Sequence, residues 1–167
     1  MSHNNIAIYP GSFDPITNGH VDLVKRTLRV FDKVIVAIAT NPDKDTSLFS
    51  LEERLQMIRE VFAGHKQRVQ ADAFEGLLVD YAERKRATVI IRGLRAVSDF
   101  EYEFQMVLSN RKLAEEIEII FMMPSENYSC LSSKIIKEMA SLGADLSEFV
   151  PSLVEKKLKE KLLKKNS

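Results

Sequence analysis

The fold is decided by a stretch near the start of the chain, residues 6–20, which reads IAIYPGSFDPITNGH. A short apolar run suits a buried strand, a tight Pro/Gly turn follows, and a T-x-G-H sequence stands where a helix should begin. A helix N-terminus has unpaired N–H groups and partial positive charge, so anions bind there. Gly19 lets a phosphate approach the backbone closely, and the imidazole of His20 can donate a hydrogen bond to it. The stretch therefore predicts a phosphate site between the first strand and the first helix.

A plainer interpretation of this stretch is an ordinary turn with one incidental surface histidine. Two more polar side chains in the same turn, Ser12 and Asp14, favour the phosphate site. The chain also lacks the common alternatives, which are the G-x-x-x-x-G-K-[ST] loop and the G-x-G-x-x-G, H-E-x-x-H and G-x-S-x-G motifs. With three histidines and a single cysteine, Cys130, we do not expect the protein to ligate zinc, and nothing beside the thiol suggests an activating base.

Strand-like and helix-like segments alternate along the chain, which is typical of βαβ units. Short apolar runs predict strands at Ile6–Tyr9, Val34–Thr40, Thr88–Arg92 and Glu118–Met123, with a weaker candidate at Arg68–Ala71. Amphipathic segments predict helices at His20–Phe31, Leu51–Phe62, Leu77–Arg86 and Phe100–Leu113, then from Ser132 or Ser133 to Leu142, and last at about 151–165. We expect one α/β domain over residues 1–167, with a doubly wound, Rossmann-like parallel sheet of about five strands and helices on both faces.

Composition limits the partners that the chain can attract. The chain has 24 Lys and Arg residues and 24 Asp and Glu residues, so its formal net charge is zero. It therefore has no net positive charge that would attract nucleic acid or an anionic membrane. No signal peptide or membrane-spanning run is evident, and a single cysteine suits a reducing compartment, so we expect a cytoplasmic protein. The lysine-rich segment 153–165 could lie on a membrane surface, but its interrupting glutamates favour a helix packed on the protein.

Polar loops follow the predicted strands at 10–20, 41–45, 93–99 and 124–133, and in such sheets they converge at the carboxyl ends of the strands. Three cations lie in these loops or at the strand end beside them, namely Lys44, Arg92 and Arg95. Guanidinium groups beside a buried strand end suit phosphate oxygens, the alternative being ion pairs with Asp99, Glu101 or Glu103. The serines at 129, 132 and 133 either cap a helix or open a second anion site. With no strong nucleophile evident, this set favours direct transfer between two bound, phosphorylated substrates.

Four blocks of the sequence resemble one enzyme family. Residues 9–20 resemble the T/H-x-G-H motif of the nucleotidyltransferase superfamily. The blocks IRGLRAVSDFEYE (91–103), NPDK (41–44) and PSENYSCLSS (124–133) narrow the resemblance to the bacterial phosphopantetheine adenylyltransferases. The resemblance runs from Ile6 to about Val150, with the order and spacing of the blocks kept. It implies that the chain joins ATP and 4′-phosphopantetheine into dephospho-coenzyme A and pyrophosphate during coenzyme A biosynthesis, with Mg²⁺ accompanying ATP.

The resemblance also implies roles for individual residues. The catalytic residues would be His20, which stabilises the transition state, and the cations Lys44 and Arg92. The residues facing ATP would be Ser12, Phe13, His20, Gly93, Leu94, Arg95, Glu103, Tyr128, Ser129, Cys130, Leu131, Ser132, Ser133 and Lys134. Those facing phosphopantetheine would be Ser12, Lys44, Leu78 and Arg92. The family is typically a homohexamer that coenzyme A inhibits. The sequence leaves open whether Lys134 and Lys137 contact phosphate, because lysine lacks the two-pronged grip of arginine.

Two other functions fit parts of the sequence. Another adenylyl- or cytidylyltransferase acting on a mononucleotide or sugar phosphate would share the first motif, but Thr17 in place of a first histidine and the block at 92–103 argue against it. A non-catalytic module that senses ATP or coenzyme A would share the fold. A sensor has no need to gather His20, Lys44 and Arg92 around two reacting phosphates.

Overall fold

The computed structural model describes residues 5–40, 46–94, 103–105, 116–129 and 131–163. Five parallel strands form one sheet in the order β3-β2-β1-β4-β5. The strands are β1 (Ile6–Gly11), β2 (Lys33–Ala39), β3 (Val69–Phe74), β4 (Val89–Gly93) and β5 (Glu118–Met122). The α-helices are α1 (Asn18–Thr27), α2 (Leu51–Val61), α3 (Leu78–Arg84), α5 (Ser133–Ser141) and α6 (Ser152–Leu163), and short 3₁₀ helices lie at Ala63–His65 and Glu126–Tyr128.

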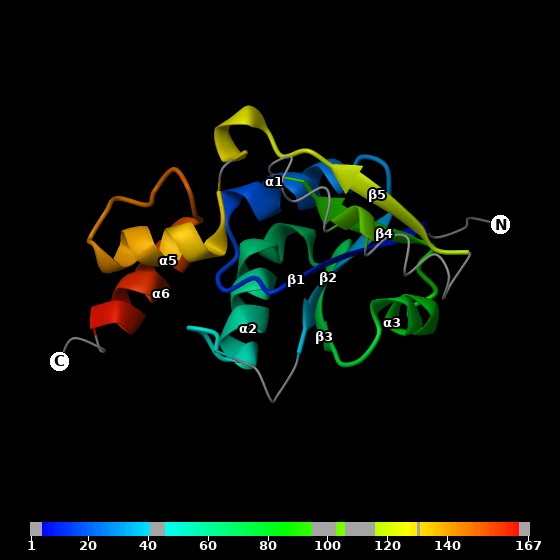
Figure 1. Cartoon of the computed structure of the whole chain (residues 1–167), viewed down its shortest axis with the longest axis horizontal. Helices are drawn as coiled ribbons and strands as arrows, with labels where there is room; N and C mark the ends of the chain where they lie inside the picture. The colour runs from blue at the N-terminus through cyan, green and yellow to red at the C-terminus, as the bar shows by residue number, and fades with distance from the viewer. Residues whose placement is uncertain (1–4, 41–45, 95–102, 106–115, 130, 164–167) are drawn as a thin grey trace.

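Alternating side chains of the central strands build a core on each face of the sheet. Ala7 and Tyr9 of β1 belong to the larger cluster, which α1, α2, α5 and α6 cover. Ile8 between them belongs to the smaller cluster, which α3 covers. Figure 1 shows the sheet passing between α2 and α3. The predicted doubly wound α/β fold with helices on both faces is therefore confirmed.

The order of the strands fixes where a ligand can bind. From β1 the chain proceeds outward through β2 to β3, then returns through α3 to form β4 on the other side of β1. The direction of winding thus changes between β1 and β4, and ligands of open parallel sheets bind beyond the carboxyl ends of strands at such a point. Gly11 ends β1 and Gly93 ends β4, so the two loops that begin there face one space.

The first turn of α1 is closed by the side chains of the T-x-G-H sequence. Thr17 is the N-cap, its hydroxyl accepts the His20 N–H, and the His20 ring accepts the Thr17 N–H in return. A capping box normally uses Glu or Gln in the second role, so the imidazole here replaces a carboxylate. Because both orphan N–H groups are satisfied, the helix begins at Asn18, two residues earlier than the predicted His20.

Several predicted boundaries moved. The weak strand candidate at 68–71 is a full strand, β3, which pairs with β2 over Val69–Phe74. The first helix ends at Thr27 rather than Phe31, because its C-terminal carbonyls are taken by turn N–H groups, such as those of Val30 and Phe31 on the carbonyl of Thr27. The predicted helix at 100–113 lies mostly outside the described residues, although residues 103–105 are helical.

The C-terminal helices pack on the protein near α2 (Figure 1). Val154 and Leu158 of α6 are fully buried in the larger core, and Lys161 forms an ion pair with Glu53 of α2. The apolar stripe of this helix is therefore covered by the protein itself. Among the described residues, no helix is both long enough and apolar enough to cross a membrane.

The start of α2 supplies a test of local stability. The Ser50 hydroxyl accepts the Glu53 N–H, and the Glu53 carboxylate accepts the Ser50 N–H. We expect Ser50→Ala to lower the free energy of unfolding by about 1 kcal/mol, because an orphan N–H loses its acceptor. Chemical denaturation measures this loss. Ser141→Ala is the control, since its hydroxyl only donates to a carbonyl within α5, and an equal loss in that variant would contradict the capping role.

Candidate active site

A cavity of about 490 Å³ opens where the carboxyl ends of β1 and β4 face the start of α1 and the loops before α5. Three predicted groups meet there, namely the T-x-G-H helix start, the Arg-Gly pair at the end of β4, and the serines at the start of α5. The lining residues are Tyr9, Pro10, Gly11, Ser12, Thr17, Gly19, His20, Leu23, Arg92, Gly93, Glu103, Pro124, Tyr128, Leu131, Ser132, Ser133 and Lys134. His20 and Arg92, distant in sequence, thus share one cavity.

Most of the predicted site residues that the structure describes line this cavity, and four do not. Phe13 is buried behind it, and Leu94, Ser129 and Leu78 are not among its lining residues. Leu78 packs instead on the smaller core cluster. Lys44, Arg95 and Cys130 lie outside the described residues.

Hydrogen bonds fix the orientation and the tautomer of His20. Its Nδ1 lies 3.0 Å from the backbone nitrogen of Thr17 and 3.1 Å from the Thr17 hydroxyl. A backbone N–H can only donate, so Nδ1 must be the nitrogen with the lone pair. The neutral ring therefore carries its proton on Nε2. This arrangement makes Nε2–H the ring's donor at the cavity that His20 lines.

Aromatic packing supports the same ring. Phe13 meets His20 edge to face, with ring centroids 5.0 Å apart, and meets Tyr9 in the same manner at 5.4 Å. Phe13 has a φ of +45°, a left-handed conformation that non-glycine residues rarely adopt. Strain of this kind persists where the surroundings over-determine the backbone, which is common at functional sites. The buried Phe13 therefore holds the His20 ring in place and does not line the cavity.

Arg92 is held by the carboxylate of Glu103. Its Nε donates to Glu103 Oε2 at 2.7 Å, and a terminal nitrogen donates to Oε1. Both side chains are largely buried, at 28% and 13% exposed. The ion-pair alternative for Arg92 is thus realised in this structure, within the predicted site. The guanidinium is fixed at the cavity, and its geometry already matches a two-oxygen anion.

Three elements hold the turn between β1 and α1 in place. The buried Asp14 carboxylate accepts the N–H groups of Leu48 and Phe49 and forms a 2.5 Å ion pair with Lys137 of α5. Arg54 of α2, itself 3% exposed, donates to the carbonyl of Ser12 at 3.2 Å. These contacts fix the backbone of the turn relative to α2 and α5.

The start of α5 is also tied to the turn. The Ser133 hydroxyl donates to the carbonyl of Pro15 at 2.8 Å, and Ser132 caps α5 by accepting the Ile135 N–H. Both serines line the cavity as well. Ser132 can therefore cap the helix and also bind a ligand in the cavity. Its hydroxyl oxygen accepts the helix N–H with one lone pair, and its O–H can still donate.

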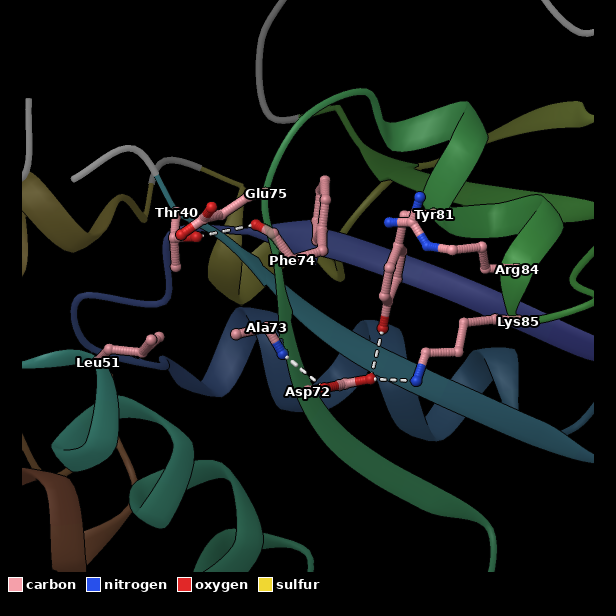
Figure 2. A pocket seen from close by; sticks show the side chains of 9 residues that line it. All are labelled: Thr40, Leu51, Asp72, Ala73, Phe74, Glu75, Tyr81, Arg84 and Lys85. Carbon is pink, nitrogen blue, oxygen red and sulfur yellow. Dashed lines mark hydrogen bonds and ion pairs between the residues drawn. The ribbon is translucent and has the colours of Figure 1, made fainter. Parts of the chain in front are cut away.

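A larger hollow of about 650 Å³ lies elsewhere, along the outer edge of β3. Figure 2 shows the Tyr81 hydroxyl and the Lys85 ammonium group converging on the Asp72 carboxylate. Burial and this carboxylate raise the pKa of the Tyr81 hydroxyl, so the phenol stays protonated. These polar groups bond to one another, and the hollow gathers none of the predicted site residues. It is therefore not the candidate site.

Comparison with known proteins agrees with this geometry. The model of the cytidylyltransferase-like family matches residues 8–139. The chain is 56% identical to "Phosphopantetheine adenylyltransferase" of Desulfosudis oleivorans, over 94% of this chain and 92% of the relative. It is 56% identical to the protein of the same name from Geotalea daltonii, over 93% and 96% of the two chains. The chain belongs to the phosphopantetheine adenylyltransferase family.

Solved structures agree on the fold of this family member. A putative nicotinate-nucleotide adenylyltransferase from Vibrio parahaemolyticus superposes with a TM-score of 0.66 at 18% identity, over 96% of this chain and 93% of that one. Nicotinic acid mononucleotide adenylyltransferase of Plasmodium falciparum also gives a TM-score of 0.66 at 18% identity, over 98% and 97% of the chains. At this identity the likeness extends to the Rossmann-like architecture alone.

Several residues at the site of this phosphopantetheine adenylyltransferase family member escaped prediction. Tyr9, Pro10 and Gly11 line the cavity and lie in the quoted first stretch, so their place in the strand-turn segment could have indicated them. Leu23 stands four residues after Gly19, on the same side of α1. Pro124 opens the polar loop 124–133 that the sequence places at this edge of the sheet, and that loop could have indicated it.

The two lysines of α5 that the sequence left open have different surroundings. Lys134 is exposed and lines the cavity, whereas Lys137 pairs with the buried Asp14. We expect Lys137→Met to lower the free energy of unfolding by about 1–3 kcal/mol, because a buried carboxylate loses its cation. Lys134→Met should change it by no more than about 0.5 kcal/mol. Denaturant unfolding of both variants at neutral pH checks this, and equal losses would contradict the assigned contacts.

Proposed function

We propose that the chain transfers the adenylyl group of ATP to 4′-phosphopantetheine, giving dephospho-coenzyme A and pyrophosphate in coenzyme A biosynthesis. An oxygen of the 4′-phosphate attacks the α-phosphorus of ATP, and the bond from that phosphorus to the bridging oxygen of the β-phosphate breaks. Family membership supports these substrates. The observation that carries the proposal is the shared cavity of His20 and Arg92 beyond the ends of β1 and β4.

His20 is the group proposed to stabilise the transition state. Negative charge moves toward the α- and β-phosphate oxygens as pyrophosphate leaves, and a donor that is already oriented stabilises it without reorganisation. The bond from the Thr17 N–H to Nδ1 supports this role, because it leaves the proton on Nε2. The N–H groups at the start of α1 add positive potential on the same side.

Cations are proposed to hold the acceptor phosphate against the repulsion of ATP. Arg92 lines the cavity, and its guanidinium group forms an ion pair with the Glu103 carboxylate. A phosphate of similar two-oxygen geometry would exchange with that carboxylate. Lys44 would be the second cation, and Ser12 and Leu78 would complete the phosphopantetheine side. Positioning of this kind supplies much of the catalysis when two bound substrates react directly.

The nucleotide is proposed to contact the residues that the family resemblance assigns to ATP. These are Ser12, Phe13, His20, Gly93, Leu94, Arg95, Glu103 and residues 128–134. The described lining residues Tyr128, Ser132 and Lys134 support this assignment. A Cβ placed on Gly19 would lie 3.2 Å from Cβ of Tyr128, so the glycine allows that segment to approach the helix start closely.

Further features of the family remain proposals for this chain. Among the described residues, no group of three or more His, Cys, Asp or Glu side chains could hold a metal ion. Mg²⁺ is proposed to arrive with the ATP substrate, on its phosphates, as the family resemblance implies. A homohexameric assembly and feedback binding of coenzyme A are expected from the family resemblance. A cytoplasmic location is proposed because the single cysteine suits a reducing compartment.

The nearest alternative is adenylyl transfer to a mononucleotide, which is the reaction that the names of the two structural neighbours describe. Incubation with ATP and each acceptor separates the two reactions. We expect pyrophosphate release and formation of dephospho-coenzyme A with 4′-phosphopantetheine, and neither with nicotinate or nicotinamide mononucleotide. Coupled pyrophosphate detection and mass spectrometry measure both products. Transfer to a mononucleotide alone would overturn the proposed acceptor, and ATP binding without transfer would indicate a sensor.

The role of His20 predicts a specific defect. His20→Ala should lower kcat by on the order of a hundredfold or more, about 3 kcal/mol of transition-state stabilisation. The affinity for ATP should stay within roughly tenfold, because the histidine acts mainly in the transition state. His65→Ala is the matched control, since it removes an imidazole from the 3₁₀ helix at 63–65. Near-normal turnover of His20→Ala would show that the assigned role is wrong.

A further inference from the structure

The segment after β5 forms one wall of the cavity, and its start is fastened to α1. Pro124 and Tyr128 of this segment line the cavity together with His20. Between them the chain forms only a single 3₁₀ turn, at Glu126–Tyr128. So short a turn has little stability of its own, so the position of the wall depends on what fastens it.

Asp22 and Arg26 of α1 make the hydrogen bonds that hold this segment, and these bonds are called the fastening below. Oδ2 of Asp22 accepts the hydroxyl of Ser125 at 2.7 Å and its backbone N–H at 3.2 Å. Arg26, one helical turn further along, donates to the carbonyl of Met123 at 2.6 Å and to Asp22 at 3.4 Å. Two neighbouring side chains of α1 thus hold the segment. The Arg26 cation binds Met123, and the Asp22 anion binds Ser125.

The same helix carries His20 at its first turn. Asp22 follows His20 by two residues, so the fastening and the catalytic ring belong to one rigid element. At the far end of the segment, Tyr128 lies against Gly19, where an added Cβ would come within 3.2 Å. The segment is therefore set against α1 at both ends, and its distance from His20 is fixed by α1 itself.

The charges of the fastening suit a place beside an anion site. Partial burial raises the pKa of the Asp22 carboxyl, but the Ser125 hydrogen bonds and the Arg26 charge outweigh it and leave the pKa below its usual value. The carboxylate is thus ionised at neutral pH. Its charge is compensated by Arg26, so it presents little net repulsion to phosphates.

We propose that Asp22 and Arg26 are positioning residues for the nucleotide, holding the wall of residues 123–128 at the spacing from His20 that ATP requires. This inference rests on the proposed function, since it assigns that wall to ATP. Neither residue lines the cavity, and both act through the segment that they hold. Loss of these hydrogen bonds should therefore weaken the binding of ATP more than the binding of the acceptor, because the proposed acceptor contact Arg92 belongs to β4 and not to this segment.

Ser125→Ala is the sharpest test, because it removes one hydroxyl and leaves Asp22, Arg26 and the lining residues intact. We expect KM for ATP to rise about tenfold or more, the scale of one hydrogen bond to a charged group, with KM for 4′-phosphopantetheine within twofold. Ser125→Thr keeps the hydroxyl and should restore KM for ATP. Hydrogen exchange should accelerate at the amides of residues 125–128 in the alanine variant.

Ser141→Ala is the matched control, since its hydroxyl also bonds within its own neighbourhood but lies on α5, away from the cavity lining. It should change neither KM nor exchange at residues 125–128. In a double-mutant cycle, Ser125→Ala should add little to Asp22→Ala in KM for ATP, because Asp22→Ala already removes the acceptor of the Ser125 hydroxyl. If the residues had a purely structural role, the variants would instead raise KM for both substrates, or lower the free energy of unfolding without changing either KM.

The outcomes separate this inference from the proposed reaction. Unchanged KM for ATP and unchanged exchange in Ser125→Ala, with an active parent protein, would overturn the positioning role and leave the reaction standing. Absence of transfer in the parent protein would overturn the reaction. Calorimetric titration with ATP then decides the inference by itself, since an equal dissociation constant in the parent and in Ser125→Ala would overturn it too.

Discussion

The hydrogen bond from the Thr17 N–H to Nδ1 of His20 is the interaction on which the site depends. It closes the first turn of α1 and at the same time sets the orientation and tautomer of the ring. A glutamate in this position would cap the helix equally well but would face the cavity with an acceptor and a negative charge. The imidazole satisfies the helix through one nitrogen and keeps a donor on the other. Capping and catalysis are thus properties of one contact.

The fold was predictable because its signals are local. The apolar runs at β1 and β2 alternate their side chains between two buried faces, and the S-x-x-E box at Ser50 fixes the start of α2. The phosphate loops could also be placed, because parallel strands bring their carboxyl ends to one edge. β3 was the weak candidate, since it is an edge strand whose middle residues are half-buried and carry Asp72 among alanines.

The supports of the site were not predictable, because each joins residues distant in sequence. Asp14 meets Lys137 across 123 positions, and Asp22 meets Ser125 across 103. The first turn marks Asp14 as a polar residue of the predicted site, but nothing in the local sequence shows that its carboxylate is buried. Nothing there distinguishes Asp22 from an ordinary surface residue such as Asp80. Only the tertiary fold shows that one is buried under three donors and that the other fastens a loop. Motif recognition finds the residues that face a substrate, and geometry is needed for those that hold them.

The Arg92–Glu103 pair shows how a chain of zero formal net charge can keep a cation ready for an anion. A largely buried guanidinium without a partner is costly, because it loses its hydration and gains nothing. Glu103 removes this cost and holds the planar guanidinium group with two donors aligned. In the proposed reaction a phosphate dianion would compete with a carboxylate of lower charge, so exchange is favourable for phosphate and unfavourable for neutral ligands. The same contact that stabilises the buried guanidinium group therefore makes the site selective for phosphate.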